Sequence, residues 1–303
     1  MISSLDQMVD KVIGLKKKPV IAVAWAQDPN TVGAVKQAVK SGFAEAVMIG
    51  KREEIIKTCL KNEIDPGIFI ILDSDNEGKA AEEAVLMARS GEADIVMKGL
   101  VGTDKFLRAV MDKESGIMLP GSVLSYVCAI EVPAYHKLLF VSDPAVIPYP
   151  DLNQKIAMAR YSVEMTAKFG IENPRIALIG ASEKPGNHFH YSSDYLEMCR
   201  MAREGAFGSC IMDGPLDIFL ACDRESVEIK GINTPVGGEA DVLLFPSLEA
   251  CNPFYKSLML FGRGELAGLI RGTEKPVVLM SRSESRKSKF FCIALSCLMA
   301  YKN

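Results

Sequence analysis

No run of apolar residues in the sequence approaches the roughly 20 residues that a membrane-spanning helix needs. The first residues also lack the order of a secretory signal, because Leu5, Met8 and Val9 recur at helical spacing and the basic cluster at 16–18 follows them. The 35 basic and 38 acidic residues are mixed along the chain, so no basic stripe indicates a nucleic-acid surface. We therefore expect a cytoplasmic protein that binds neither membranes nor nucleic acid.

The eight cysteines form no CxxC pair and show no metal-ligand spacing. Several lie inside apolar segments such as 126–130, which predicts buried thiols in a reducing compartment. His188 and His190 have an HxH spacing, but no third ligand has an identifiable spacing, so a zinc site is not expected. The sequence also contains no GxSxG elbow, no GxxxxGKS/T loop and no GxGxxG after its first predicted strand.

The sequence does have the composition of a globular protein. Of its 303 residues, 49% are hydrophobic and 24% are charged, and this length suits one large or two medium domains. Short β-rich runs alternate with helical patterns, beginning with a strand predicted at 20–26 and a helix that starts after Asp28. The alternation predicts an α/β fold with mostly parallel sheets flanked by helices.

A proline-rich stretch at 143–150 interrupts this alternation and indicates a hinge. We expect residues 1–145 together with 281–303 to form a first α/β domain, and residues 146–280 to form a second. Enzymes with two such domains often bind their ligands in the cleft between them. The sequence therefore predicts a two-domain enzyme with its active site in that cleft.

Three loops that follow predicted strands carry the candidate binding residues. The first loop, at 97–108, has glycines that allow close approach of a ligand, and Thr103 can cap the next helix. The N-terminus of that helix offers free N–H groups to a phosphate, and Lys98 and Arg108 add positive charge. An ordinary turn with Gly99 and two surface cations explains these residues equally well.

The second loop contains Asp213, Gly214 and Pro215, in which the aspartate can orient a ligand amide or hydroxyl. Taken alone, a turn made of good turn formers explains these three residues better. The third loop contains Ser281, Arg282 and Glu284, directly before the last predicted helix. An arginine in this place can hold a phosphate with two hydrogen bonds, and the glutamate is a candidate base. A serine-rich helix cap is the simpler alternative.

Several short segments along nearly the whole chain occur in an order that is specific as a set. They are Ala24–Asp28 (AWAQD), Ala93–Gly99 (ADIVMKG), Phe106–Val110 (FLRAV), Leu138–Asp143 (LLFVSD), Tyr149–Lys155 (YPDLNQK), Gly170–Pro174 (GIENP), Asp213–Leu216 (DGPL), Lys256–Leu258 (KSL) and Pro276–Arg282 (PVVLMSR). In these segments the chain resembles the phosphate acetyltransferase and phosphate butyryltransferase family, and its butyryl branch in particular.

The resemblance implies a fold like that of the isocitrate and isopropylmalate dehydrogenases, with the active site in the interdomain cleft. It implies transfer of a short-chain, butyryl-like acyl group between coenzyme A and inorganic phosphate. Acyl-CoA or CoA and phosphate or acyl phosphate would then be the partners, with coenzyme A as a substrate and with neither a cofactor nor a metal. The family also implies a homodimer or a higher homo-oligomer.

The family's catalytic pattern transfers only in part. Ser281 and Arg282 match a serine–arginine pair of the acetyl branch, but the aspartate that serves there as base is replaced by Ser288. The butyryl branch carries an acid three residues after the serine, where this chain has Glu284. A base is needed because a thiol with a pKa of about 8.5 is poorly ionised at neutral pH. We hypothesise that Arg282 and Arg108 clamp phosphate, that Ser281 bonds the reacting oxygen or sulfur, and that Glu284 assists deprotonation.

The expected substrate- and phosphate-binding set consists of residues from the first two loops and one helix. Its members are Lys98, Gly99, Thr103, Arg108, Asp213, Gly214, Pro215 and Asn252. Two segments depart from the family. Residues 186–192 replace the motif NPKMPAT, which puts His188 where the family has lysine, and Cys251 replaces the glycine of E-x-G-N, where its side chain can block backbone approach.

Two alternatives stay open, and the departures support the first of them. One is a catalytically weak or non-catalytic relative that retains affinity for coenzyme A or acyl phosphate. The other is a nicotinamide-dependent decarboxylating dehydrogenase on a similar fold, which would need a set of metal-binding aspartates that the sequence does not provide.

Overall fold

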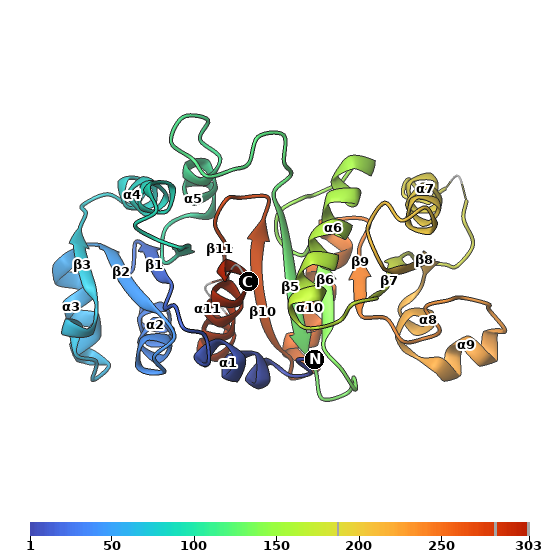
Figure 1. The fold of residues 1–303 in the computed structure, drawn as a ribbon, viewed down its shortest axis with the longest axis horizontal. Coiled ribbons are helices and arrows are strands. Elements are labelled where there is room, and N and C mark those ends of the chain that lie inside the picture. The colour runs from blue at the N-terminus through green and yellow to red at the C-terminus, as the bar shows by residue number, and fades with distance from the viewer. Residues whose placement is uncertain (187, 282–283, 302–303) are drawn as a thin grey trace. The chain divides into compact units, whose positions relative to one another are not determined.

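The computed structural model describes residues 1–186, 188–281 and 284–301 (Figure 1). The chain divides into two compact units. The first, which we call the central unit, contains Met1–Ser4 and Ser125–Glu265, and the second, the outer unit, contains Leu5–Leu124 and the chain from Leu266 onward. The domain boundaries expected at 145 and 281 lie elsewhere than these limits, and independent folding of two domains stays a prediction.

The outer unit contains a mostly parallel sheet in the order β3-β2-β1-β4-β11-β10. Only β10 and β11 pair in the antiparallel sense. The strands are β1 (Val20–Ala24), β2 (Glu45–Gly50), β3 (Ile70–Asp73), β4 (Ile95–Lys98), β10 (Glu265–Arg271) and β11 (Val277–Val278). The helices are α1 (Leu5–Ile13), α2 (Pro29–Lys40), α3 (Arg52–Lys61), α4 (Glu77–Ser90), α5 (Thr103–Val110) and α11 (Arg286–Ala300), with a short 3-10 helix at Pro66–Ile68. The predicted α/β alternation is confirmed in this unit.

Two helices of the outer unit, α2 and α4, begin where the sequence provides a side-chain cap. Asp28 accepts a hydrogen bond from the backbone N of Thr31 at 2.9 Å, and a proline follows at the first position of α2. Asn76 caps α4 in the same way. Such caps contribute about 1 kcal/mol each. α2 packs against α11, while α4 packs against α5 and β1. The strand order reverses between β1 and β4, so right-handed crossovers place α2 and α4 on opposite faces of the sheet.

The strands of the central unit follow the order β5-β6-β9-β7-β8 and are mostly parallel, since only β5 and β6 pair in the antiparallel sense. Its strands are β5 (Ser125–Glu131), β6 (Leu139–Ser142), β7 (Arg175–Ile179), β8 (Ile211–Leu216) and β9 (Val242–Leu244). Its helices are α6 (Leu152–Lys168), α7 (Ser192–Arg203), α8 (Ile218–Cys222), α9 (Arg224–Lys230) and α10 (Leu248–Leu260). Residues 125–145, expected in the first domain, belong here because β6 pairs with β9.

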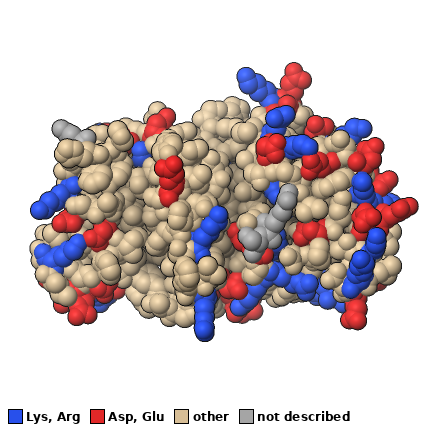
Figure 2. Space-filling model, turned by 180° about the vertical axis from the view of Figure 1, so that it is seen from behind, with Lys and Arg blue, Asp and Glu red and all other residues tan. Residues whose placement is uncertain are grey.

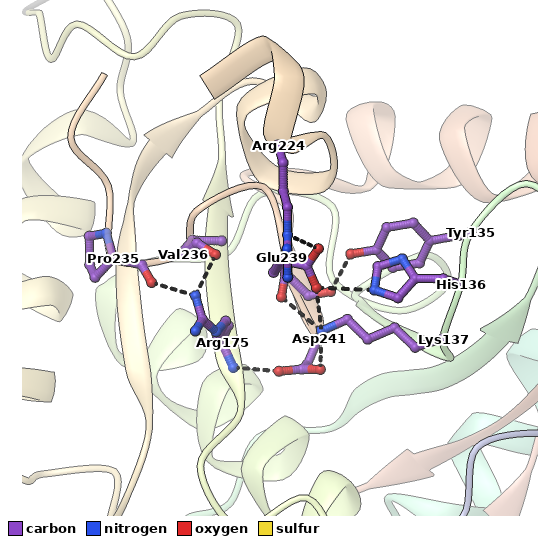
Figure 3. Close-up of polar contacts among 10 residues, drawn as sticks. Tyr135, His136, Lys137, Arg175, Arg224, Pro235, Val236, Glu239 and Asp241 are labelled. Atoms are coloured by element: carbon purple, nitrogen blue, oxygen red, sulfur yellow. Dashed lines mark hydrogen bonds and ion pairs between the residues drawn. The ribbon is translucent and has the colours of Figure 1, made fainter. Parts of the chain in front are cut away.

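A network of ion pairs fastens the segment 234–241 of the central unit (Figure 3). Lys137 Nζ lies 2.7 Å from Asp241 Oδ1, and His136 Nε2 lies 3.0 Å from Glu239 Oε2. Partial burial opposes the charge of Glu239, but hydrogen bonds from Arg224 and His136 hold the pKa of that carboxyl below its usual value. The network matters for the candidate site because the same segment carries a threonine that bonds Asp213.

The surface agrees with the mixed charge of the sequence. On the face drawn in Figure 2, and apart from its grey atoms, blue and red residues lie interspersed without a stripe of one sign. Among the residues that the structure describes, no helix is both long enough and apolar enough to cross a membrane.

Candidate active site

The first and third predicted loops leave neighbouring strands of the outer unit. β11 runs parallel to β4, with Val278 opposite Met97, so the carboxyl ends of both strands lie at the same edge of the sheet. Lys98 is the last residue of β4, and Ser281 follows the end of β11 by three residues. The side chain of Lys98 is buried, and its Nζ donates a hydrogen bond to the carbonyl of Gly99 at 3.2 Å. A lysine and a serine thus reach one sheet edge from separate parts of the sequence.

Gly99 has a structural reason to be glycine. A Cβ at this position would lie 2.6 Å from the carbonyl oxygen of Trp25 and 2.7 Å from that of Ala24. The two loops are also joined by hydrogen bonds from Gly99 N to Ala24 O and from Leu100 N to Trp25 O, both 2.9 Å long. The close approach at this glycine is therefore made by the loop after β1. Contact between Gly99 and a ligand stays a prediction.

The start of α5 differs from the prediction. The helix begins at Thr103, and Gly102 occupies the cap position without any side-chain cap, so the predicted Thr103 cap is wrong. Instead the carboxylate of Glu77 accepts a hydrogen bond from Gly102 N at 3.3 Å and also pairs with Lys105. The bond from Lys105 holds the pKa of Glu77 below its ordinary value. A carboxylate of this chain therefore already occupies part of the anion-binding end of α5.

Arg108 lies in the last turn of α5 and lines an open hollow of about 370 Å³ beside α4. The lining residues are Asn76, Gly78, Glu82, Lys105, Arg108, Ala109, Asp112 and Ser115. In the described part of the chain, Arg108 makes neither a hydrogen bond nor an ion pair, and its side chain is exposed. The guanidinium of Arg108 is thus available to an anionic ligand, although Lys105 is paired with Glu77 and the lining also holds the carboxylates of Glu82 and Asp112.

The structure does not join this hollow to the sheet edge. Lys98, Ser281 and Glu284 are absent from the described lining of the hollow. Arg282 lies outside the described residues. The convergence of Arg108 and Arg282 on one phosphate therefore stays a prediction.

The segment that leads into α11 is held by its own residues. The carbonyl of Ser281 accepts hydrogen bonds from Lys289 Nζ at 3.2 Å and from Glu284 N at 3.4 Å. Lys289 is a buried cation that the sequence analysis missed, although a basic residue in the first turn after a candidate serine was a usable signal. Ser288, at the family's aspartate position, is buried and accepts a hydrogen bond from Leu266 N at 3.3 Å. Its position ties α11 to β10.

The Asp213 segment is part of a strand, so its prediction as a loop at a strand end is wrong. β8 continues through Leu216 because Gly214 packs tightly against β7, where a Cβ would lie 2.6 Å from the carbonyl oxygen of Leu178. Asp213 Oδ2 accepts a hydrogen bond from Thr234 Oγ1 at 2.6 Å. The carboxylate is thus oriented by the segment that the ion-pair network fastens. Ligand binding by Asp213, Gly214 and Pro215 stays a prediction.

Asn252 and its neighbour face the loop after β6. Asn252 Nδ2 donates a hydrogen bond to the carbonyl of Pro144 at 2.8 Å. Cys251 is fully buried, and burial, together with nearby Cys128 and Asp143, raises the pKa of its thiol well above the usual value. The thiol fills the interior of the central unit, and obstruction of a ligand by this cysteine stays a prediction.

Asp143 is a further residue that the sequence analysis did not select. Its carboxylate accepts four hydrogen bonds, from Ser125 Oγ and Tyr126 N at 3.0 Å each and from Ala145 N and Val146 N at 2.8 and 2.9 Å. Burial raises the pKa of Asp143 in spite of these donors. The carboxylate fixes the loop that Asn252 contacts.

The two histidines of the HxH pattern, His188 and His190, are both exposed. Within the described residues, no group of three or more histidine, cysteine, aspartate or glutamate side chains is placed to hold a metal ion.

Comparison with known proteins assigns the chain to a family. The model of the family described as phosphate acetyl/butaryl transferase matches residues 75–297. The phosphate butyryltransferase of Clostridium acetobutylicum is 38% identical over 300 residues, which cover 99% of each chain. The crystal structure of a branched-chain phosphotransacylase from Enterococcus faecalis has a TM-score of 0.82 at 28% identity and covers 94% of this chain and 100% of its own.

A 4-hydroxythreonine-4-phosphate dehydrogenase from Klebsiella pneumoniae has a TM-score of 0.55 at 11% identity, covering 94% of this chain and 100% of its own. This similarity shows the fold alone. The family match and the full-length relative carry the assignment of activity, and the chain belongs to the phosphate acetyl/butyryl transferase family and is a phosphate acyltransferase.

Proposed function

We propose that this enzyme moves a short-chain, butyryl-like acyl group between coenzyme A and inorganic phosphate. The reaction is acyl-CoA plus phosphate giving acyl phosphate plus CoA. The observation that supports the proposal is the shared sheet edge of β4 and β11, to which Lys98 and Ser281 both belong and where the buried Lys289 bonds the Ser281 carbonyl. Cationic and hydroxyl groups at the carboxyl ends of parallel strands suit a phosphate-bearing substrate.

The chemistry requires two kinds of group. In the forward direction a phosphate oxygen attacks the acyl carbonyl carbon, the carbon–sulfur bond breaks, and the thiolate leaves and takes up a proton. Cations hold the phosphate and the oxyanion that develops on the carbonyl, which is where Lys98 and Arg282 would act. We propose that the Ser281 hydroxyl donates a hydrogen bond to the reacting oxygen or sulfur. In the reverse direction Glu284 would remove the proton of the coenzyme A thiol.

Arg108 is proposed to bind a phosphate group of a substrate from its own hollow. The argument rests on Arg108 alone, because its guanidinium has no ion pair within the described residues, whereas Lys105 is paired with Glu77 and the carboxylates of Glu82 and Asp112 line the same hollow. The family assigns both inorganic phosphate and the phosphates of coenzyme A as possible occupants. The proposed homodimer and the cytoplasmic location stay predictions.

The acyl group is proposed to be butyryl or a chain of similar size. Support comes from the relative in Clostridium acetobutylicum, whose name specifies butyryl, whereas the name of the Enterococcus faecalis protein specifies branched chains. Departures from the family motifs at 186–192 and at Cys251 argue for a test of several acyl groups.

A thiol-release assay tests the proposal. The purified chain is mixed with acetyl-, propionyl-, butyryl- or isovaleryl-CoA, with and without phosphate, and free thiol is measured over time. We expect phosphate-dependent release that is fastest for butyryl-CoA or isovaleryl-CoA. Binding of acyl-CoA without any release would favour the non-catalytic alternative, and release that is independent of phosphate would contradict the transfer reaction.

A further inference from the structure

Trp25, the only tryptophan of the chain, has a backbone conformation that is unusual for a large side chain. It directly follows β1 and has a φ of 57°, which lies in the left-handed region that bulky residues rarely adopt. A residue stays in this region only where the surrounding structure fixes it, and such outliers gather at functional sites. The conformation of Trp25 therefore indicates that its side chain has a role beyond packing.

Backbone hydrogen bonds on both sides hold Trp25 in this conformation. Its carbonyl accepts a hydrogen bond from Leu100 N at 2.9 Å, and the next residue, Ala26, donates its N–H to the carbonyl of Ile49 at 3.0 Å. The carbonyl oxygen of Trp25 would also lie only 2.6 Å from a Cβ at Gly99. The backbone of Trp25 is thus fixed between the carboxyl ends of β2 and β4.

Trp25 lies where the strand order of the outer unit reverses. β1 pairs with β4 so that Ala24 is opposite Lys98, and β2 lies on the other side of β1. Open α/β sheets bind ligands outside the carboxyl ends of their strands at this point. Neighbouring strands are about 4.8 Å apart, so the backbone of Trp25 is one strand from Lys98 and two strands from β11. Trp25 therefore belongs to the sheet edge that carries the proposed function, within one unit of the chain.

The indole of Trp25 is available to a ligand. The residue is half-buried, and within the described part of the chain its ring joins no aromatic pair and its Nε1–H donates no hydrogen bond. An indole face suits a hydrocarbon better than a phosphate, whereas Lys98, one strand away, carries the charge that suits a phosphate. In an acyl phosphate the acyl group is bonded directly to the phosphate. The two neighbouring strand ends therefore match the two halves of this substrate.

We infer that Trp25 contacts the acyl chain of the substrate and determines the preference for chain length. The inference rests on the proposed function, since it takes an acyl group that moves between coenzyme A and phosphate. The ring covers one side of the acyl carbons, and the phosphate lies toward Lys98. Butyryl has two methylene groups more than acetyl, so contact with the ring favours the longer chain.

Fluorescence of the wild-type chain tests the contact, because Trp25 is its only source of tryptophan emission. The chain is titrated with CoA, acetyl-CoA and butyryl-CoA in the absence of phosphate. We expect the emission to shift to shorter wavelength, most for butyryl-CoA and least for CoA, because the acyl chain displaces water from the ring. Equal shifts for CoA and butyryl-CoA, or no shift at saturation, would overturn the contact.

Two substitutions and a matched control test the specificity. Trp25→Gly removes the ring and suits a φ of 57°, whereas Trp25→Phe keeps an aromatic ring at the same place. Glu63→Gly is the control, because Glu63 is exposed, has a φ of 54° and lies between α3 and the start of β3, toward the opposite edge of the sheet. We expect Trp25→Gly to lower the butyryl-to-acetyl ratio of kcat/KM about tenfold, mainly through KM. Trp25→Phe should lower the ratio less, and Glu63→Gly should keep the wild-type ratio.

The outcomes distinguish this inference from the proposed function. An unchanged ratio in Trp25→Gly overturns the role of the ring, and an equal fall in Glu63→Gly assigns the effect to the backbone and overturns it too. If the wild-type chain binds acyl-CoA without turnover, the proposed function fails, and the fluorescence titration alone decides the inference. If it binds no acyl-CoA, both fail. The titration uses the wild-type chain, so it also decides the inference where circular dichroism shows that Trp25→Gly is not folded.

Discussion

Substituting alanine for Gly99 tests whether the crossing of the β1 and β4 loops builds the site. The added Cβ would lie 2.6 and 2.7 Å from the backbone carbonyl oxygens of Trp25 and Ala24, which are groups that cannot rotate away. The loops must therefore separate, which strains or breaks the two hydrogen bonds that join Gly99 and Leu100 to them.

The magnitude follows from these contacts. Overpacking of this kind costs about 1–3 kcal/mol, and each lost backbone hydrogen bond costs about 0.5–1.5 kcal/mol. Together we expect the free energy of unfolding to fall by about 2–6 kcal/mol in Gly99→Ala. Because Lys98 directly precedes the glycine, kcat/KM should fall as well.

Denaturant unfolding of Gly99→Ala and of Gly14→Ala measures the difference. Gly14 is the control, because a Cβ there meets its nearest atoms at 3.5 and 3.8 Å, which is ordinary contact. We expect the control to change the free energy of unfolding by less than about 0.5 kcal/mol. Wild-type stability and activity in Gly99→Ala would refute the argument from backbone contact.

Three further predictions concern single side chains. Asp143→Asn replaces an oxygen that accepts two hydrogen bonds by an amide donor. The free energy of unfolding measured by urea titration should therefore fall by about 2–4 kcal/mol. An unchanged unfolding midpoint would show that the four hydrogen bonds of Asp143 are not needed for stability. Arg108→Gln should raise KM for phosphate or for CoA at least about tenfold. It should leave the unfolding midpoint unchanged, because the arginine has no bond within the described chain. If the variant has the wild-type KM for both phosphate and CoA, Arg108 does not belong to the binding set. Glu284→Gln should lower the rate of CoA acylation and flatten its pH profile, and if both match the wild type, Glu284 is not the base.

The sequence predicted the fold class well because hydrophobic periodicity is a local property. The strands at 20–24 and 95–98 and their alternation with helices follow from β-branched runs and from caps such as Asp28. The boundaries of the two units, which depend on strand pairing, were harder to predict. The antiparallel pair of β5 and β6 joins the central unit through β9, a strand about 100 residues away, and no local pattern specifies that partner.

The residues of the candidate site likewise divide into those that local sequence predicted and those that depend on tertiary contacts. Lys98 and Ser281 were selected because each follows a strand, and the register of β4 and β11 then places both at one edge. Asp213 was misplaced because turn formers were taken to end a strand, whereas Gly214 is needed for close packing against Leu178. Glu77 was missed because its partners, Gly102 and Lys105, lie on another element. Contacts of this kind depend on tertiary packing.

Phosphorus NMR of the reaction mixture tests the central claim most directly. With butyryl-CoA and phosphate, the wild-type chain should form butyryl phosphate in a one-to-one ratio with free CoA thiol. Ser281→Ala should form it at least about 100-fold more slowly, with an unchanged unfolding midpoint, if the hydroxyl acts on the reacting atoms. An absence of the acyl phosphate signal in the wild type, or full activity in Ser281→Ala, would contradict the assignment of the reaction to the sheet edge of β4 and β11.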